Sequence, residues 1–264
     1  MSVGPGRIAY DVVGDGPLVI CVHGMGDSRA AFRHLTPRLV AAGYRVATVD
    51  VRGHGESSVD WASYAEAEVA GDLIALARHL GGPAILVGSS SSAAAVPIAA
   101  ARAPELVSGA VLISPFVGNP KLSLLLRLAQ GAVTHSPLLW GMYYTTLYPG
   151  AKPADFAEHR AAMRATLRQP GRMAAMRGVV APGPVRWSEQ VGGLRCPVLI
   201  VMGDKDPDFP DPESEARQAQ ALLAPVAASV AVRMIENSGH YPYADAPEPT
   251  AVAIASFAAE VGRA

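Results

Sequence analysis

The sequence predicts a three-layer α/β/α fold, in which helices cover both faces of a mostly parallel β-sheet and a helical segment is inserted. Three observations predict it. Short apolar segments alternate with amphipathic helical segments, which is typical of right-handed βαβ crossovers. The apolar segments are rich in Val, Ile and Leu throughout, as expected for strands buried on both faces. One long region, residues 118–193, contains no clear strand pattern.

Seven short hydrophobic segments have the composition and length of strands. They are Arg7–Val13, Leu18–Val22, Arg45–Val49, Ala84–Val87, Val107–Ile113, Pro197–Val201 and Ser229–Ile235. Five segments between or after them have the pattern of amphipathic helices. They are Ala30–Ala42, Tyr64–Leu80, Ser90–Ala103, Pro212–Leu223 and Thr250–Val261.

The region 118–193 mixes Leu, Met, Trp and Tyr with Arg, which indicates a helical insertion that we call the lid. The predicted lid helices are Leu122–Ala132, Leu138–Leu147 and Phe156–Arg168. A loop is expected at Val179–Pro184, where two prolines flank a glycine. The sequence therefore predicts an α/β core of residues 1–117 and 194–264 that carries the lid.

Composition restricts the class of protein. With 264 residues, the chain can bury a substantial core as one large domain. A formal net charge of −1 argues against nucleic-acid binding, which needs a clustered basic surface. No apolar run approaches the ~20 residues of a membrane span, and the first residues lack a signal-peptide core. We expect a cytoplasmic protein without a membrane partner, in which Cys21 and Cys196 are free thiols and not a disulfide.

The strongest functional signal lies in residues 83–96. An apolar strand runs into Gly88, and four serines then precede an alanine-rich helical segment. A sharp strand-to-helix turn lifts a serine hydroxyl above the sheet edge, beside the free N–H groups of the first helical turn. The spacing Gly-x-Ser-x-small places a nucleophile at Ser90. Because Ser92 and Ala93 stand where glycines are commoner, a neighbouring serine and a purely structural turn are the alternatives.

A glycine-flanked loop follows the strand Leu18–Val22 and reads His23-Gly24-Met25-Gly26. Such a loop, at the end of a strand near the sheet centre, can aim a backbone N–H into the cleft. The N–H groups of Met25 and Ser91 are therefore predicted to form a two-donor oxyanion hole. We interpret His23 as a structural histidine that holds this loop.

An acid and a base are predicted after two later strands. Asp206 lies in a turn bracketed by Gly203 and Pro207, and Asp204 and Asp208 are the alternatives to it. A surface turn with solvated carboxylates is the structural alternative. His240 is the histidine that lies between the last predicted strand and the closing helix. The chain order of nucleophile, acid and base matches one of the three known orders of a Ser-His-Asp triad.

With these residues, the chain resembles the α/β-hydrolase superfamily, in particular its lid-bearing esterases and lipases. The resemblance covers nearly the whole chain. It rests on residues 23–26, Asp50–Ser57, the serine turn, Gly203–Asp206 and Gly239–Pro242. It implies that Asp50–Ser57 organises the wall of the cleft. In some relatives the acid follows an earlier strand, but Ser114 stands at that place here, which favours Asp206.

The residues and the resemblance together predict hydrolysis of a small-molecule carboxylic ester, thioester or lactone with an apolar acyl part. No cofactor and no metal are expected, because His and Cys do not occur at ligand spacing. The alternatives are a C–C bond hydrolase, a perhydrolase or a lyase with the same triad, and a non-catalytic ligand receptor. A dehalogenase or an epoxide hydrolase would need aspartate at position 90.

Lid side chains predict the substrate pocket. Trp140, Tyr143 and Tyr144 are the predicted substrate-binding residues, and the alternative is that they only seal the lid onto the core. Further apolar candidates are Leu122, Leu125, Leu126, Met142 and Tyr148. The arginines 160, 164, 168 and 172 recur every four residues, and the first three would share one helical face. A solvated face is the expectation, and docking of an acidic carrier protein that bears the acyl group is the sharper hypothesis.

Overall fold

The structure is a computed structural model that describes residues 1–117, 131–180 and 187–263. Within these residues, seven strands form one sheet with the order β3-β5-β4-β6-β7-β8-β9. They are β3 (Tyr10–Val13), β4 (Leu18–Val22), β5 (Arg45–Val49), β6 (Ala84–Ser89), β7 (Val107–Ile113), β8 (Val198–Gly203) and β9 (Val230–Ile235). All neighbours are parallel except β3, which pairs antiparallel with β5. Two short strands, β1 (Ser2–Val3) and β2 (Gly6–Arg7), pair with each other.

Burial explains why the apolar runs of the sequence predict the strands. Every residue of β4, β6 and β8 is buried, so both faces of these strands carry apolar side chains. The bounds of β4, β5 and β7 are those that the sequence predicts. At the sheet edge, β9 alternates half-buried and exposed residues over its first four positions. The expected fold class is thus confirmed.

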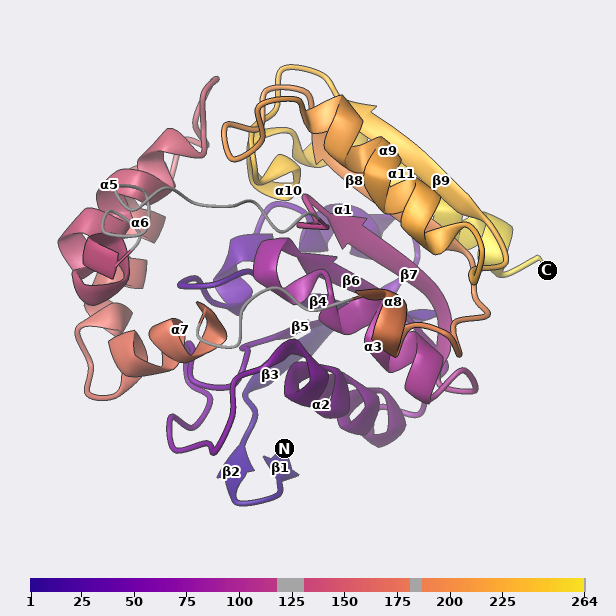
Figure 1. Cartoon of the computed structure of the whole chain (residues 1–264), viewed down its shortest axis with the longest axis horizontal. Coiled ribbons are helices and arrows are strands. Elements are labelled where there is room, and N and C mark those ends of the chain that lie inside the picture. Colours follow the sequence, from indigo (N-terminus) through magenta and orange to yellow (C-terminus); the bar gives the residue numbers. More distant parts are fainter. Residues whose placement is uncertain (118–130, 181–186, 264) are drawn as a thin grey trace.

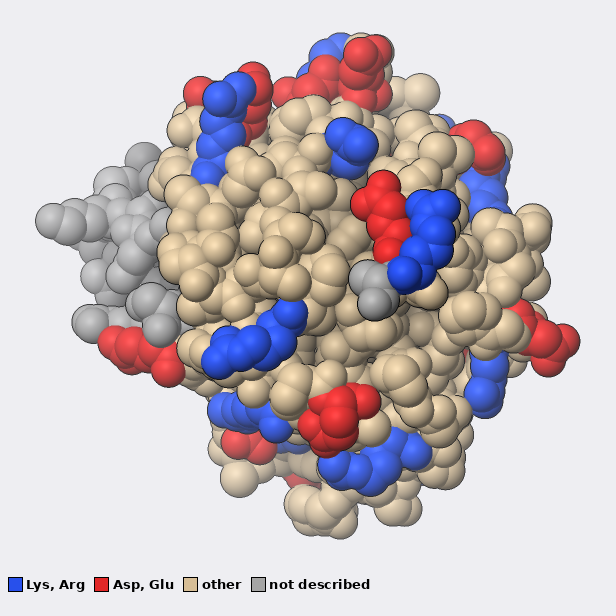
Figure 2. Space-filling model, turned by 90° about the vertical axis from the view of Figure 1, so that its right-hand side faces the viewer, with Lys and Arg blue, Asp and Glu red and all other residues tan. Residues whose placement is uncertain are grey.

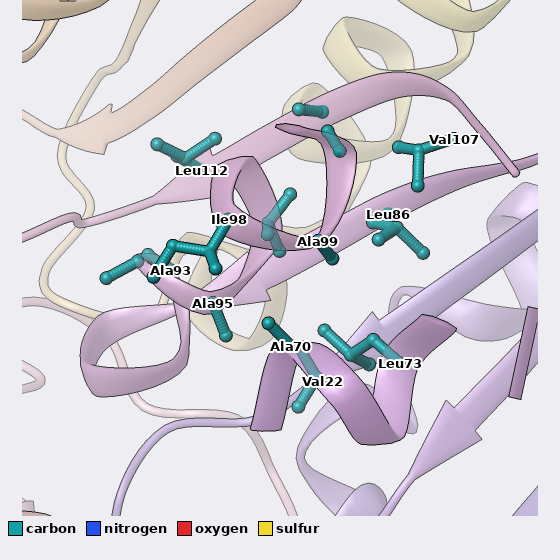
Figure 3. Packing of buried hydrophobic residues seen from close by; sticks show 14 of the residues in the cluster. Val22, Ala70, Leu73, Leu86, Ala93, Ala95, Ile98, Ala99, Val107 and Leu112 are labelled. Atoms are coloured by element: carbon teal, nitrogen blue, oxygen red, sulfur yellow. The ribbon is translucent and has the colours of Figure 1, made fainter. Parts of the chain in front are cut away.

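Helices cover both faces of the sheet (Figure 1), and each helical layer packs on one hydrophobic cluster. The first layer consists of α2 (Glu66–His79), α3 (Ala95–Arg102) and α9 (Pro212–Leu223). Figure 3 shows Ala70 and Leu73 of α2 and Ala95, Ile98 and Ala99 of α3 meeting strand residues of this cluster. The second layer contains α1 (Thr36–Ala41), α10 (Pro242–Asp245) and α11 (Pro247–Val261).

Prolines divide two segments that the sequence predicts as single helices. The predicted helix Ser90–Ala103 is a 3-10 turn, η2 (Ser90–Ser92), followed by α3. Pro97 lies in the first turn of α3, and its ring would clash with the carbonyl four residues earlier in a longer helix. The predicted helix Ala30–Ala42 is likewise η1 (Arg29–Phe32) and α1, which has Pro37 in its first turn.

The described part of the lid is helical. Its helices are α5 (Pro137–Thr146), α6 (Phe156–Leu167), α7 (Arg172–Val180) and α8 (Trp187–Gln190). Helices α5, α6 and α7 lie together to one side of the sheet, whereas α8 lies beside α3 (Figure 1). The loop predicted from Val179 is wrong at its first two residues, which continue α7. Most of the predicted helix Leu122–Ala132 lies outside the described residues. The pocket candidates Leu122, Leu125 and Leu126 lie there as well.

Across the described ranges, no helix combines the length and the hydropathy that crossing a bilayer requires. Both cysteines are free: Cys21 is buried in β4 and Cys196 is half-buried. On the face shown in Figure 2, acidic and basic side chains lie close to one another around broad uncharged areas.

Candidate active site

Ser90, Asp206 and His240 meet above the carboxyl ends of β6, β8 and β9. The Nε2 atom of His240 lies 2.9 Å from Oγ of Ser90, and its Nδ1 atom lies 2.7 Å from Oδ2 of Asp206. His240 and Asp206 are almost fully buried, whereas Ser90 is half-buried. Three side chains from distant parts of the chain thus form one continuous chain of hydrogen bonds.

The turn after β6 explains why Ser90 is the serine that faces His240. Its φ of +55° lies in the left-handed region, which a non-glycine residue adopts at an energetic cost. A Cβ atom on Gly88 would lie 2.6 Å from a methyl carbon of Val96, so only glycine fits there. Ser89 instead directs its hydroxyl to Tyr243, and Ser91 Oγ accepts a hydrogen bond from another loop.

That other loop carries Met25. The N–H of Met25 donates to Oγ of Ser91 over 2.8 Å, which places the predicted oxyanion donor next to the serine turn. A substrate carbonyl that takes this N–H must first displace the Ser91 hydroxyl. The preceding Gly24 lies so close to the nucleophile that a Cβ there would be 2.8 Å from Cβ of Ser90.

His23 holds this loop in place. Its Nε2 atom accepts the N–H of Val51 over 3.1 Å, so its proton lies on Nδ1 and is donated to the carbonyl of Gly24. The side chain is fully buried. These bonds fit a structural role and leave no ring nitrogen free to act as a base.

The turn after β8 holds three aspartates with different partners. Asp206 bonds His240, as described above, and its Oδ1 accepts the N–H of Asp208. Asp204 is exposed and accepts the N–H of Ser238 over 3.3 Å. Asp208 accepts a 2.6 Å hydrogen bond from the hydroxyl of Tyr143, and its Oδ2 lies 3.7 Å from Nδ1 of His240. Asp206 is therefore the carboxylate in hydrogen-bonding contact with the imidazole.

The charges around His240 favour its protonated form. Burial alone would lower the pKa of His240, but the charge of Asp206, its hydrogen bond and the charge of Asp208 together outweigh burial. The pKa of His240 is therefore raised above its ordinary value. An imidazole in this setting can accept a proton from Ser90 and hold it as a stabilised imidazolium.

The loop that carries His240 is held by groups that the sequence did not single out. Asp245 accepts the hydroxyl of Ser238 and the N–H of Gly239, over 2.6 and 2.8 Å. The N–H of His240 itself donates to the carbonyl of Leu147, directly after α5. No sequence motif predicts these contacts, because they join residues on separate elements.

The three predicted lid residues have different surroundings. Trp140 is buried, and a Cβ on Gly26 would collide with its ring. Tyr144 is 1% exposed and donates its hydroxyl to Asp27, so it packs the lid onto the core. Of the three, Tyr143 is the one that contacts the turn of the acid.

Two aromatic rings that the sequence did not single out flank the base. The ring centroids of Phe116 and Phe209 lie 5.8 and 6.2 Å from that of His240. Phe116 is 38% exposed, so its ring is accessible beside the imidazole. These rings give the site an apolar side.

The arginines of the lid do not form one wholly solvated face. Arg160 donates to Oγ1 of Thr145 and lies over a phenylalanine ring. Arg164 is half-buried, and its aliphatic part lies against Gly141 of α5. Arg168 is exposed, whereas Arg172 donates to a backbone carbonyl of the core. Docking of an acidic carrier protein here stays a prediction.

The segment Asp50–Ser57 is tied into the core by buried polar groups. Arg52 makes two 2.8 Å hydrogen bonds to Asp72 and lies 4.5 Å from the centroid of the Trp61 ring. Asp50 is fully buried and accepts the backbone N–H groups of Arg29 and Glu56. These contacts give the segment a structural role.

In the described part of the chain, Asp206, Asp208 and His240 are the one group whose potential metal-ligand atoms lie within 4.8 Å of one another. The Nδ1 atom of His240 already shares a proton with Asp206, however, and its Nε2 atom faces Ser90. This arrangement suits proton transfer, and we assign no metal to it.

Comparison with known proteins agrees with the fold. A family model described as "Alpha/beta hydrolase family" matches residues 19–253. The 2-(acetamidomethylene)succinate hydrolase of Mesorhizobium japonicum is 29% identical over 272 residues, which cover 96% of this chain and 92% of that protein. Epoxide hydrolase B of Mycobacterium tuberculosis is 36% identical over 113 residues, which cover 41% of this chain and 32% of that protein. The structure of a thermophilic esterase from Thermogutta terrifontis has a TM-score of 0.72 and 25% identity, over 98% of this chain and 96% of that one.

Proposed function

The chain belongs to the α/β-hydrolase family, and on that premise we propose that it is a serine hydrolase. It cleaves a carboxylic ester, thioester or lactone with an apolar acyl part through an acyl-enzyme. The observation that carries this proposal is the chain of hydrogen bonds from Ser90 through His240 to Asp206.

The first half of the reaction forms the acyl-enzyme. Oγ of Ser90 attacks the carbonyl carbon while Nε2 of His240 takes its proton, and Asp206 stabilises the imidazolium. The N–H groups of Met25 and Ser91 donate to the oxyanion of the tetrahedral intermediate. His240 then gives its proton to the leaving group. In the second half, water attacks the acyl carbon and His240 accepts the proton of that water. His240 then returns the proton to Oγ of Ser90 as the bond from Oγ to the acyl carbon breaks, and the carboxylic acid leaves.

The apolar acyl part is inferred from the rings beside the base. Phe116 and Phe209 flank His240, and Phe116 presents accessible surface. An acyl chain that covers such a ring gains about 25 cal/mol per Å² of apolar surface removed from water. A hydrophobic acyl group is therefore favoured over a charged one.

Two relatives carry names that suggest other substrates to test at this site. Serine at position 90 counts against an aspartate nucleophile, and the epoxide hydrolase matches only part of this chain. The relative matched over nearly its whole length is named for 2-(acetamidomethylene)succinate. A substrate panel should therefore contain p-nitrophenyl acetate, butyrate and octanoate, an acyl thioester, a lactone, an epoxide and that compound.

The proposal is tested by labelling with a fluorophosphonate probe, followed by peptide mass spectrometry. We expect the probe on Ser90, together with turnover of p-nitrophenyl esters that Ser90→Ala abolishes while the thermal unfolding temperature stays within a few degrees. Ser92→Ala is the matched control, because its hydroxyl lies in the same turn and should not affect labelling. Labelling of another serine, or unchanged turnover by Ser90→Ala, would refute the nucleophile. A protein that binds esters but reacts with no probe would be a receptor.

A further inference from the structure

A second carboxylate lies beside the base. Oδ2 of Asp208 is 3.7 Å from Nδ1 of His240, the same nitrogen that Asp206 contacts at 2.7 Å. The two carboxylates are joined, because the N–H of Asp208 donates to Oδ1 of Asp206 over 3.0 Å. The side chain of Asp208 is 15% exposed, so water screens its charge only in part.

This second carboxylate is bound to the lid. The hydroxyl of Tyr143, in α5, donates to Oδ1 of Asp208 over 2.6 Å and so leaves Oδ2 on the side of the imidazole. Burial and the negative charge of Asp208 both raise the pKa of Tyr143, so this hydroxyl keeps its proton. The contact therefore orients the carboxylate across the junction between lid and core.

Other described groups around the imidazole are Ser90, the rings of Phe116 and Phe209, and Tyr241. The pKa of Tyr241 is raised by burial, so Tyr241 is neutral at neutral pH. Among the described residues that contact the imidazole, Asp206 and Asp208 are thus the negative charges.

We infer that Asp208 is a second positioning carboxylate for His240 and that Tyr143 of the lid anchors it there. Helix α5 then contributes to the electrostatic environment of the base. Asp208 need move only about 1 Å closer to reach hydrogen-bonding distance of Nδ1. It can therefore take over part of the role of Asp206 when that carboxylate is lost. The kinetic consequences rest on the proposed function, but the electrostatic ones do not.

The first experiment measures the titration of His240 without substrate, from the low-field proton NMR signal of Nδ1–H. Removing the charge with Asp208→Asn destabilises the imidazolium, so the transition moves to lower pH. Tyr143→Phe frees the carboxylate to turn toward water, and the transition moves the same way by a smaller amount. Asp204→Asn is the matched control, since it removes a charge from the same turn but keeps the acceptor for Ser238.

If Asp208→Asn leaves the pH of the His240 transition unchanged, the role of Asp208 is overturned. The same holds if Asp204→Asn shifts this pH as far as Asp208→Asn does. A shift to higher pH in Tyr143→Phe would mean that the hydroxyl screens the carboxylate, and would overturn its role as an anchor. A misfolded variant is recognised by loss of the remaining dispersed signals, and Asp208→Ala then repeats the charge removal in a smaller side chain.

The second experiment is a double-mutant cycle on ester hydrolysis. Asp208→Asn should raise kcat/KM on the acid side of the profile, relative to the optimum, by about threefold or more, because less imidazole is protonated there. Asp206→Asn should retain at least about tenfold more activity than the double variant Asp206→Asn/Asp208→Asn. If the activity lost in the double variant equals the product of the two single losses, Asp208 does not take over the role of Asp206, and this part of the inference is overturned. If no variant or wild-type protein hydrolyses esters while the NMR shifts occur, the proposed function fails and the electrostatic inference stands.

Discussion

Asp27 and His159 form a buried pair that joins the core to the lid. Oδ1 of Asp27 lies 2.9 Å from Nε2 of His159 in α6, and its Oδ2 accepts the hydroxyl of Tyr144 in α5. Asp27 is 4% exposed and lies two residues after Met25. The loop that carries the proposed oxyanion donor is therefore fixed by two lid helices.

Breaking this pair should destabilise the protein strongly. In His159→Leu, the Asp27 carboxylate stays buried but loses one of its hydrogen-bond partners. We therefore expect a fall of about 3 kcal/mol in the free energy of unfolding. Urea denaturation measures it. Asp155→Asn is the matched control, because its pair with Arg33 also joins lid to core but is half-exposed and should cost about 1 kcal/mol or less. Equal losses would contradict the importance of burial.

The same pair predicts how stability depends on acid. Burial alone would raise the pKa of Asp27, but the charge of His159 and its hydrogen bond lower it below the ordinary value. Its carboxylate therefore stabilises the fold above about pH 4, and this contribution is lost as the pH falls toward the lowered folded-state value. Between about pH 4 and 2, the free energy of unfolding should fall more steeply in the wild type than in Asp27→Asn, by up to about 1.4 kcal/mol per pH unit. Parallel curves would show that Asp27 does not titrate in this way.

Gly24→Ala should damage catalysis and not the fold. The new methyl group would lie 2.8 Å from Cβ of Ser90, which displaces the nucleophile from its position beside His240. We expect a loss of about 100-fold in kcat for a p-nitrophenyl ester, with folded far-UV circular dichroism. In the control Gly71→Ala, the methyl group meets no atom within 4 Å on the helix α2. That variant should keep its activity and gain about 0.5 to 1 kcal/mol.

Phe116→Ala tests the acyl preference. If the acyl chain lies against this ring, the variant should lose more activity on octanoate than on acetate, by roughly five- to tenfold in kcat/KM. Val252, an exposed residue of α11, provides the control Val252→Ala. Equal losses on both esters would assign Phe116 to packing around His240 and not to the substrate.

The parts of the molecule that depend on local pattern were accessible from the sequence. The strands β4, β5 and β7 follow from runs of buried apolar residues, and the order of Ser90, Asp206 and His240 follows from what ends each strand. The split of the helix after Ser90 had its signal in Pro97. The contacts of Asp208 with Tyr143 and of Asp27 with His159 had none. They join residues 65 and 132 positions apart, and only the docking of the lid brings them together.

The hydrogen bond from His240 N–H to the carbonyl of Leu147 has a consequence for protein engineering. The backbone of the base is secured by the segment that directly follows α5. A truncated version without residues 131–180 would lose that acceptor, together with Tyr143 and His159. Chimaeras that exchange this insertion between family members must therefore preserve its docking bonds, or the graft will alter the chemistry as well as the choice of substrate.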